Sequence, residues 1–238
     1  MFSLIRHHLS DFINDLKEDS HLKHKKSYSQ SGEDMIVNFI FEQLGIDYPT
    51  YIDVGAFNPY ILSNTAFFYK KGCHGINIEP NPTSFKEFTR IRKRDVNLNI
   101  GIADKEDYLK YFNFEESALN TFSETEARRI IELGKKLTGT LQIKTRSLVE
   151  VLIQYCPQTK PDFMSIDVEG FDAKIIQQTV RQDFFYPIVI CVETINYSLK
   201  GDGSKNKDIS IHLEKQGYLL YADTNINSIF VRKDYWLR

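Results

Sequence analysis

The amino-acid sequence predicts an α/β fold with a mostly parallel sheet, helices on both faces and an antiparallel hairpin at the carboxyl end. Short apolar runs alternate with helix-length segments along most of the chain, which is typical of folds built from β-α-β units. Residues 51–54 run directly into a glycine turn, and the next apolar strand, 75–79, follows after one crossover helix. Near the end, two β-rich runs flank a turn that contains Asn225 and Asn227, which indicates the hairpin.

Each remaining element is predicted from its apolar spacing and its end signals. Ser31, with Asp34 three residues later, has the spacing of a capping box, and Pro82 suits the first turn of a helix. The less regular stretch 104–146 is predicted to form an insertion over the carboxyl edge of the sheet, with weak strands at 108–114 and 141–145. We expect helices at residues 31–45, 62–71, 82–91, 123–133, 147–155, 173–180 and up to 216, and sheet strands at 51–54, 75–79, 96–100, 163–167, 188–193, 218–222 and 228–231.

The chain is predicted to have two parts, an extension of residues 1–26 and a main domain of residues 27–238. In the extension, apolar residues recur at helical spacing, which predicts an amphipathic helix. We expect this helix to pack on the main domain or on a second copy of the chain, which would make a homodimer. Acidic residues on its polar face disfavour the alternative of a role at a membrane surface.

The composition limits the classes of function. The chain has 238 residues, of which 42% are hydrophobic and 26% are charged, as expected of a globular protein with one substantial core. Its formal net charge of −2 argues against nucleic-acid binding by charge alone. No apolar run approaches the ~20 residues that a transmembrane helix needs. The three cysteines show no paired spacing, which favours reduced thiols and a cytoplasmic location.

The glycine turn after the first strand predicts a nucleoside site. Gly55 is followed by Ala56 and Phe57, so the further glycines that let a backbone approach a pyrophosphate are missing. Glu79 closes the next strand 24 residues after Gly55, which is close to the spacing at which an acid holds a ribose hydroxyl pair. A single nucleoside without phosphates fits this pattern better than a dinucleotide, and S-adenosylmethionine is the obvious candidate.

Carboxylates close four of the predicted strands, at Asp53, Glu79, Asp167 and Glu193. In open α/β sheets these strand ends meet at the ligand-binding edge. Asp167 is followed two residues later by Glu169, and two close carboxylates suit either a general base or half of a divalent-metal site. The sequence does not choose between these roles. The structural alternatives are that Asp53 caps the next helix, that Glu79 bonds the amides after Pro80, and that Glu169 or Glu193 forms a surface salt bridge. No Cys/His cluster has the spacing of a zinc site, so no metal ligands are assigned.

Five blocks of sequence, in this order, resemble the FkbM family of S-adenosylmethionine-dependent methyltransferases, and most of all its branch with a Ser-Gln-x-Gly-Glu-Asp motif. The resemblance covers roughly residues 27–235. The blocks are Tyr28-Ser-Gln-Ser-Gly-Glu-Asp34, Asp53-Val-Gly-Ala56, Ser63-Asn-Thr65, Lys71-Gly-Cys-His-Gly-Ile-Asn-Ile-Glu-Pro80 and Ser165-Ile-Asp-Val-Glu-Gly170. Two positions depart from the family pattern: Cys73 stands where the family commonly has Trp, and Phe57 where small or polar residues are frequent.

The resemblance implies a Rossmann-like class I methyltransferase fold with a seven-stranded sheet, and methyl transfer to a hydroxyl of a sugar, glycan or related small molecule. By position, Asp53 and Gly55 face the methionine part of the cofactor, Glu79 binds the ribose, and residues 101–102 lie beside the adenine. The expected cofactor-binding set is Gln30, Asp53, Gly55, Ala56, Asn64, Thr65, Glu79, Pro80, Gly101, Ile102 and Asp167. The expected catalytic set is Asp167 as the base, with Glu169 or the pair Glu33 and Asp34 orienting the acceptor.

Two other functions remain open from the sequence. A nicotinamide-dependent oxidoreductase uses the same kind of sheet, but the missing glycines after Gly55 disfavour it. A non-catalytic interaction module is disfavoured by the retained strand-end carboxylates. Asn64 and Thr65 are equally ambiguous, since they suit either the carboxylate of the cofactor or the cap of a helix.

Overall fold

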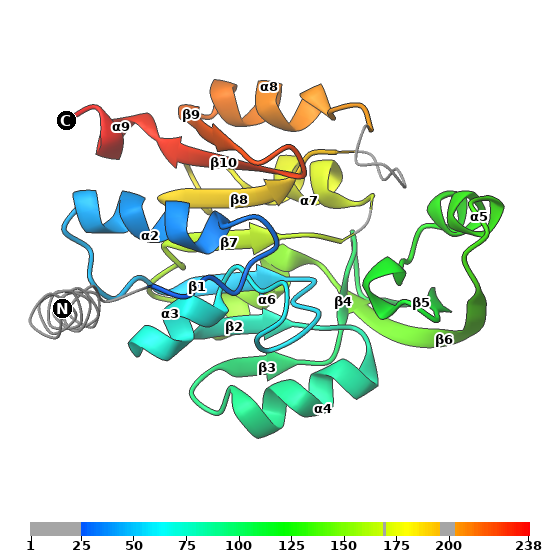
Figure 1. The fold of residues 1–238 in the computed structure, drawn as a ribbon. Coiled ribbons are helices and arrows are strands. Elements are labelled where there is room, and N and C mark those ends of the chain that lie inside the picture. The colour runs from blue at the N-terminus through cyan, green and yellow to red at the C-terminus, as the bar shows by residue number, and fades with distance from the viewer. Residues whose placement is uncertain (1–24, 169, 196–202) are drawn as a thin grey trace, which may run out of the picture.

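The computed structural model describes residues 25–168, 170–195 and 203–238 (Figure 1). The amphipathic helix predicted for residues 1–26 therefore lies almost entirely outside the described residues, and so does Glu169. All three cysteines are free, with Cys73 and Cys191 buried. None of the helices in the described ranges is both long enough and apolar enough to cross a membrane.

A seven-stranded sheet with the order β3-β2-β1-β7-β8-β10-β9 forms the centre of the molecule (Figure 1). Its pairs are parallel except at β10, which runs antiparallel to both β8 and β9. The predicted mostly parallel sheet with a closing hairpin is therefore confirmed. The strands are β1 (Tyr51–Val54), β2 (Gly75–Ile78), β3 (Val96–Leu98), β7 (Phe163–Ile166), β8 (Val189–Glu193), β9 (Tyr218–Asp223) and β10 (Asn227–Arg232).

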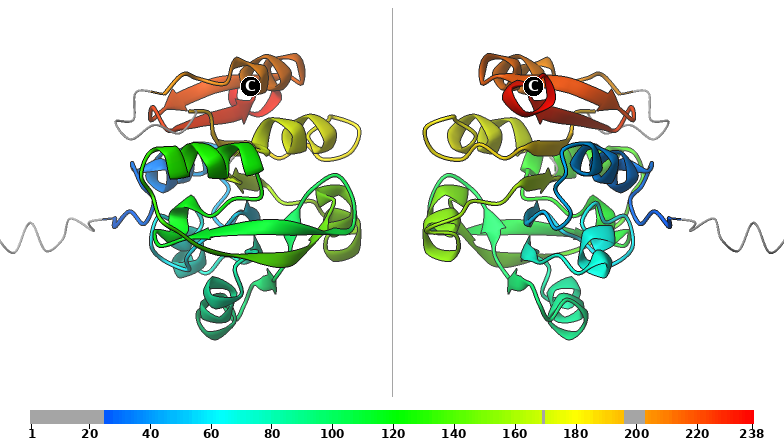
Figure 2. Two further views of the ribbon diagram at one scale, coloured as in Figure 1. Left: turned by 90° about the vertical axis from the view of Figure 1, so that its right-hand side faces the viewer. Right: turned by 90° about the vertical axis from the view of Figure 1, so that its left-hand side faces the viewer.

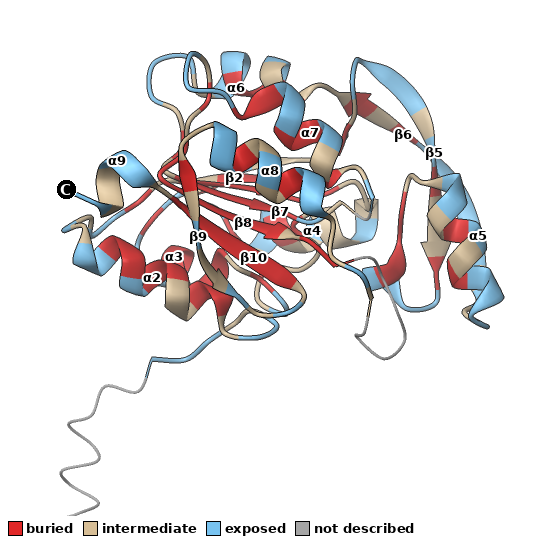
Figure 3. Ribbon diagram, turned by 90° about the horizontal axis from the view of Figure 1, so that it is seen from above, coloured by how far each residue is buried: buried red, intermediate tan, exposed pale blue. Residues whose placement is uncertain are grey.

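Helices cover both faces of the sheet because its central strands are apolar on both sides. In β1, Ile52 and Val54 join the core under α6 (Leu148–Tyr155), α7 (Asp172–Thr179) and α8 (Lys207–Lys215). The alternate residue Tyr51 joins the opposite core, with α2 (Glu33–Gln43), α3 (Ala66–Lys71) and α9 (Lys233–Trp236). Buried residues accordingly gather along the strands and on the helix surfaces that face them (Figure 3). Helix α4 (Pro82–Ile91) packs beside the edge strand β3.

A second, three-stranded sheet with the order β4-β6-β5 interrupts the main fold. It lies across the carboxyl ends of the central strands (Figure 1, right; Figure 2, left), where residues 104–146 were predicted to form an insertion. Strand β6 begins before the predicted range 141–145 because its exposed first half also pairs with β5. Every residue of β5 has a partner in β6. The elements are β4 (Gly101–Ile102), β5 (Asp107–Phe114), the 3-10 turn η1 (Ser117–Leu119), α5 (Glu124–Glu132) and β6 (Leu137–Arg146).

The start of α2 corrects a prediction. The helix begins at Glu33 after Gly32, which takes a left-handed φ of 87° and has no side chain with which to cap it. The Ser29 hydroxyl accepts from the first-turn N–H of Asp34 at 3.4 Å. Asp34 is not the partner of Ser31 in a capping box. Its carboxylate instead accepts hydrogen bonds from the Ser27 and Ser29 hydroxyls and from the backbone N–H groups of Tyr28 and Met35. The hydrogen bonds between Asp34 and residues 27–29, which hold the loop before the helix, therefore replace the predicted capping contact with Ser31.

Candidate functional site

A cavity of about 390 Å³ lies at the carboxyl edge of the main sheet. Its floor is formed by the residues that follow β1, β2 and β7 and by the end of β8, and the insertion forms the opposite wall. This is the edge at which open α/β sheets bind their ligands. The strand-end carboxylates Asp53, Glu79, Asp167 and Glu193 all line the cavity, as their positions in the sequence predicted.

Gly55 joins three strand ends into one rigid turn. Its φ is +81°, and a Cβ at this position would lie 1.8 Å from the carbonyl oxygen of Asp167. The N–H groups of Gly55 and Ala56 both donate to the Ile78 carbonyl at 3.0 Å, and the Asp167 N–H donates to Val54 at 3.0 Å. Only glycine satisfies both the backbone conformation and this close approach.

Glu79 is held at the cavity by backbone N–H groups from two loops. One carboxylate oxygen accepts from the Phe57 N–H at 2.7 Å and the other accepts from the Asn81 N–H at 2.7 Å. Burial raises the pKa of Glu79 to about 8, although these two N–H groups oppose the shift. Since each carboxylate oxygen has roughly two acceptor positions, each can accept one further hydrogen bond from a ligand.

Asp53 is buried in β1, where its carboxylate is hydrogen-bonded to the Thr65 and Ser165 side chains. One of its oxygens accepts from the Thr65 hydroxyl at 2.6 Å. That hydroxyl in turn accepts from the Arg92 guanidinium at 3.2 Å. Burial raises the pKa of Asp53, and the Thr65 hydrogen bond and the Arg92 charge act against that rise. Thr65 is not among the described residues that line the cavity, so it contacts Asp53 on the side away from the ligand space.

The acids predicted to carry catalysis are placed in different surroundings. Asp167, which is exposed, lines the cavity directly after β7. Glu33 and Asp34 are fully buried and are not among the described lining residues. Burial acts to raise the pKa of Glu33, but hydrogen bonds led by that from Asn227 hold it below its usual range. The amide of Asn227, which donates to Glu33 at 3.0 Å, lines the cavity and connects Glu33 to the site.

The wall formed by the insertion is mostly apolar. Tyr111 and Phe122 pack with their ring centroids 4.7 Å apart, and Phe122 lies so close to Gly101 that a Cβ there would be 2.4 Å from the ring. Ile102, Ala118 and Leu119 add apolar surface to this wall, and Ser117, Asn120 and Thr121 add its polar groups. A flat apolar ligand surface therefore finds contacts on this side of the cavity, opposite the carboxylates.

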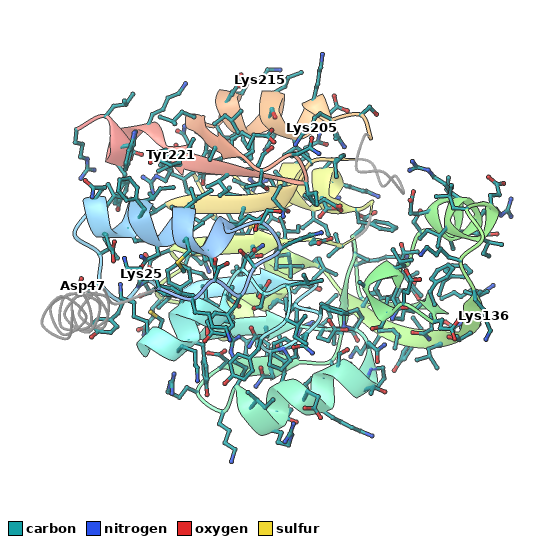
Figure 4. All side chains as sticks on the ribbon, viewed as in Figure 1. Lys25, Asp47, Lys136, Lys205, Lys215 and Tyr221 are labelled. Atoms are coloured by element: carbon teal, nitrogen blue, oxygen red, sulfur yellow. The ribbon has the colours of Figure 1, made fainter. Side chains whose placement is uncertain are left out.

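Among the described residues, those that line the cavity include four acidic side chains and no Lys, Arg or His. Cationic side chains with labels in Figure 4, Lys136 and Lys215, lie on the outside of the molecule. Among the described residues, no group of three or more His, Cys, Asp or Glu side chains is arranged to hold a metal ion. The lining of this cavity is therefore suited to a ligand that carries positive charge.

The structure brings together nearly all the residues predicted to bind the cofactor. Thr65 is the exception, and Asn64 donates to the Ser165 hydroxyl at 3.2 Å while lining the cavity. The predicted residues in the lining are Gln30, Asp53, Gly55, Ala56, Asn64, Glu79, Pro80, Gly101, Ile102 and Asp167.

Two groups of residues at the site escaped prediction. The wall residues 117–122 come from a stretch without regular periodicity. Arg92 stands in a basic run at the end of α4, where a cation is ordinarily exposed and interacts with the helix dipole. The available signal was its spacing of four residues from Phe88, which places both on the buried side of the helix.

The chain matches the family defined as the methyltransferase FkbM domain over residues 53–220, which includes the glycine turn, Glu79 and Asp167. It belongs to the FkbM methyltransferase family. The chain is thus a member of a family of S-adenosylmethionine-dependent methyltransferases, as its sequence motifs indicated. No curated protein matches the chain in sequence.

Solved structures with a similar fold include other methyltransferases. A Staphylococcus aureus protein assigned as a caffeoyl-CoA O-methyltransferase is 11% identical, with a TM-score of 0.47 over 96% of this chain and 97% of that one. The O-methyltransferase from Bacillus cereus, solved in complex with SAH, is 9% identical, with a TM-score of 0.41 over 93% and 87% of the two chains. The methyltransferase domain of bacterial CtHen1-C is 11% identical, with a TM-score of 0.43 over 85% and 99%. Likeness at this level carries no conclusion about the reaction or its substrate.

Proposed function

We propose that this FkbM-family protein transfers a methyl group from S-adenosylmethionine to a hydroxyl of an uncharged, sugar-like acceptor. The observation that carries the proposal is the buried Glu79 carboxylate, held by two backbone N–H groups beside the Gly55 turn with acceptor positions remaining on both oxygens. Two neighbouring hydroxyls of a ribose are the natural donors for such a carboxylate.

The rest of the cavity fits the same cofactor. The apolar wall of Ile102, Tyr111 and Phe122 suits an adenine ring. Asp53 offers a carboxylate to the ammonium group of the methionine part, and the acidic lining favours the positive sulfonium. The same lining opposes the nicotinamide alternative, because a dinucleotide would bring an anionic pyrophosphate among carboxylates without a Lys, Arg or His in the described lining.

When bound, the cofactor supplies a methyl group that its sulfonium already activates. The protein must then orient the acceptor and take its proton, and alignment alone contributes up to about 7–11 kcal/mol in favourable cases. We assign the proton to the carboxylate of Asp167, an exposed residue that lines the cavity. Glu169 stays a predicted orienting group. Glu33 and Asp34, whose carboxylates are engaged within the protein, are assigned to supporting Asn227 and residues 27–31 rather than to contacting the acceptor.

Calorimetry with S-adenosylhomocysteine and with NAD tests the cofactor assignment. We expect S-adenosylhomocysteine to bind and NAD not to bind. At pH 8.5, where the ionised form of Glu79 predominates, Glu79→Ala should weaken that binding at least tenfold without unfolding, because hydrogen bonds to a charged acceptor contribute roughly 1.5–3 kcal/mol each. Glu214→Ala, on the exposed face of α8, serves as the control. Tight binding of NAD alone, or full affinity in Glu79→Ala, would contradict the assignment.

The acceptor class requires a separate measurement. Released S-adenosylhomocysteine should be recorded with a series of matched sugars that differ only in charge, such as an uncharged hexose glycoside and the corresponding uronic acid. We expect turnover with the uncharged member and little with the acid, because the described lining is acidic. Preferred turnover of the uronic acid would refute the proposed acceptor class while leaving the cofactor assignment intact.

A further inference from the structure

Arg92 is a fully buried cation that is not among the described lining residues of the cavity and has no direct part in the proposed reaction. Its side chain is 0% exposed, and its Nε donates to Asp95, also 0% exposed in its side chain, at 2.9 Å. Its other nitrogens donate to the Pro59 carbonyl at 3.0 Å, to the Tyr51 hydroxyl at 2.8 Å and to the Thr65 hydroxyl at 3.2 Å. The guanidinium therefore connects the end of α4 to β1, to the segment after the Gly55 turn and to the start of α3.

This network fixes the direction of the proton on Thr65. A guanidinium has only donors, so the Thr65 oxygen must accept from Arg92 and its single O–H is available to another partner. That partner is the Asp53 carboxylate, 2.6 Å away. The same logic applies to Tyr51, whose hydroxyl accepts from Arg92 and donates to Asp95 at 2.8 Å. The buried cation thus favours the orientation in which Thr65 donates to Asp53, the shortest of its contacts, over donation to the Ser63 hydroxyl 3.5 Å away.

Asp95 keeps the guanidinium in place. Besides Arg92 and Tyr51, its carboxylate accepts from the Gly75 N–H and from the Asn77 side chain, each at 2.9 Å. These contacts tie the ion pair to β2, the strand that delivers Glu79. A buried ion pair is by itself weak evidence for stability, because the cost of desolvating both charges offsets much of their attraction. Holding the cavity residues in place gives this buried ion pair a role other than stability.

We infer that Arg92 and Thr65 are positioning residues, which hold the Asp53 carboxylate in one orientation for the ammonium group of the methionine part of S-adenosylmethionine. This inference rests on the proposed function. Arg92 places a positive charge and a directed hydroxyl on the side of Asp53 that faces away from the cavity. The carboxylate therefore enters ligand binding already oriented, which lowers the ordering cost of the complex.

The experiment compares two ligands in the wild-type protein and in variants of Thr65 and Asp53. S-adenosylhomocysteine carries the ammonium group that Asp53 is proposed to hold, whereas adenosine lacks the amino-acid part. Thr65→Val keeps the shape of the side chain but removes the hydroxyl, and Thr65→Ser keeps the hydroxyl. We expect Thr65→Val to weaken S-adenosylhomocysteine about tenfold to a hundredfold, as for a hydrogen bond to a charged group, and to leave adenosine binding unchanged. Thr65→Ser should restore most of the affinity.

A double-mutant cycle with Asp53→Asn separates positioning from a general structural effect. If Thr65 acts through Asp53, Thr65→Val should cost little further affinity in the Asp53→Asn background. Equal losses in both backgrounds, or equal losses for both ligands, would overturn the inference. Wild-type affinity of Thr65→Val for S-adenosylhomocysteine would do the same. If the wild-type protein itself bound no S-adenosylhomocysteine, the proposed function would fail instead, so the two failures are distinguishable.

Discussion

Replacing Gly55 with alanine tests the geometry of the cavity floor. The new Cβ would lie 1.8 Å from the Asp167 carbonyl oxygen, whereas real Cβ contacts are essentially never shorter than 3.0 Å. The ends of β1 and β7 would have to separate by roughly 1.2 Å. That movement strains the hydrogen bond from the Asp167 N–H to Val54 and the two that converge on the Ile78 carbonyl.

The expected cost has two parts. An alanine at the φ of +81° costs about 1–2 kcal/mol in backbone conformation. Loss of two of the three strand-end hydrogen bonds adds about 1–3 kcal/mol. The sum of about 2–5 kcal/mol corresponds to a lowering of Tm by about 5–15 °C for a domain of this size. The free energy of S-adenosylhomocysteine binding should fall by more than the free energy of unfolding does, because the same turn carries the Phe57 N–H that holds Glu79.

Gly134 offers a closely matched control. Its φ is +83°, almost the same as at Gly55, but a Cβ there would meet no atom within 4 Å. Gly134→Ala should therefore show only the backbone cost of about 1–2 kcal/mol. Thermal melts of both variants, with and without S-adenosylhomocysteine, give the comparison. Equal Tm values for the two variants would refute the argument that the contact with Asp167, rather than φ alone, requires glycine at position 55.

The other predictions concern single features of the site. Because burial raises the pKa of Glu79 to about 8, the fraction of the ionised form, which accepts the ribose hydroxyls, grows as pH rises. The affinity for adenosine should therefore increase from pH 6 to 8.5 and then level off, and Glu79→Gln should abolish this dependence. A wild-type affinity that falls over this range would contradict the prediction. Asp167→Asn should lower turnover by about 10²–10⁴-fold with little change in cofactor affinity. Inactivation by EDTA that Mg²⁺ reverses would favour a metal role for Asp167, and near-normal turnover of Asp167→Asn would remove it from the mechanism. Deleting residues 1–26 should leave cofactor affinity intact and alter only assembly, so a folded truncation that no longer binds cofactor would show that the division at residue 27 is wrong.

Local chemistry made much of the fold predictable. The apolar run of β1 was predicted with the bounds that the structure shows, because a buried parallel strand that ends at a glycine turn leaves a clear signal. The capping residues Asn81, Ser123 and Ser147 accept hydrogen bonds from N–H groups two or three residues later. Such contacts span a few residues, so the helix starts near them were predictable from local sequence. The carboxylates at the cavity were predictable for a related reason, since each directly ends an apolar strand or lies inside one.

Long-range contacts account for what the sequence left hidden. Arg92 is recognisable as a buried residue only once Tyr51, Pro59, Thr65 and Asp95 have been brought around it, and these are up to 41 residues away in the chain. Asp34 had a suitable local partner in Ser31, but four donors from other residues outcompete it. The insertion wall has no periodic pattern of its own, and Phe122 becomes part of the site through its packing on Gly101 and Tyr111.

The departures from local rules gather around the cavity, which is where function would place them. Thr65 stands at the N-cap position of α3, but its own side chain makes no capping hydrogen bond, and the Ser63 hydroxyl accepts from the Ala66 N–H. The Thr65 hydroxyl donates to Asp53 instead, so the helix forgoes a contact worth about 1 kcal/mol. Phe57 takes a positive φ of 54°, an uncommon conformation for an aromatic residue, and its N–H thereby holds Glu79. Both residues forgo a favourable local conformation or contact, and in both cases the group involved supports a carboxylate of the cavity. The placement of these exceptions therefore argues, independently of the family match, that Asp53 and Glu79 are the groups this part of the fold is organised to present.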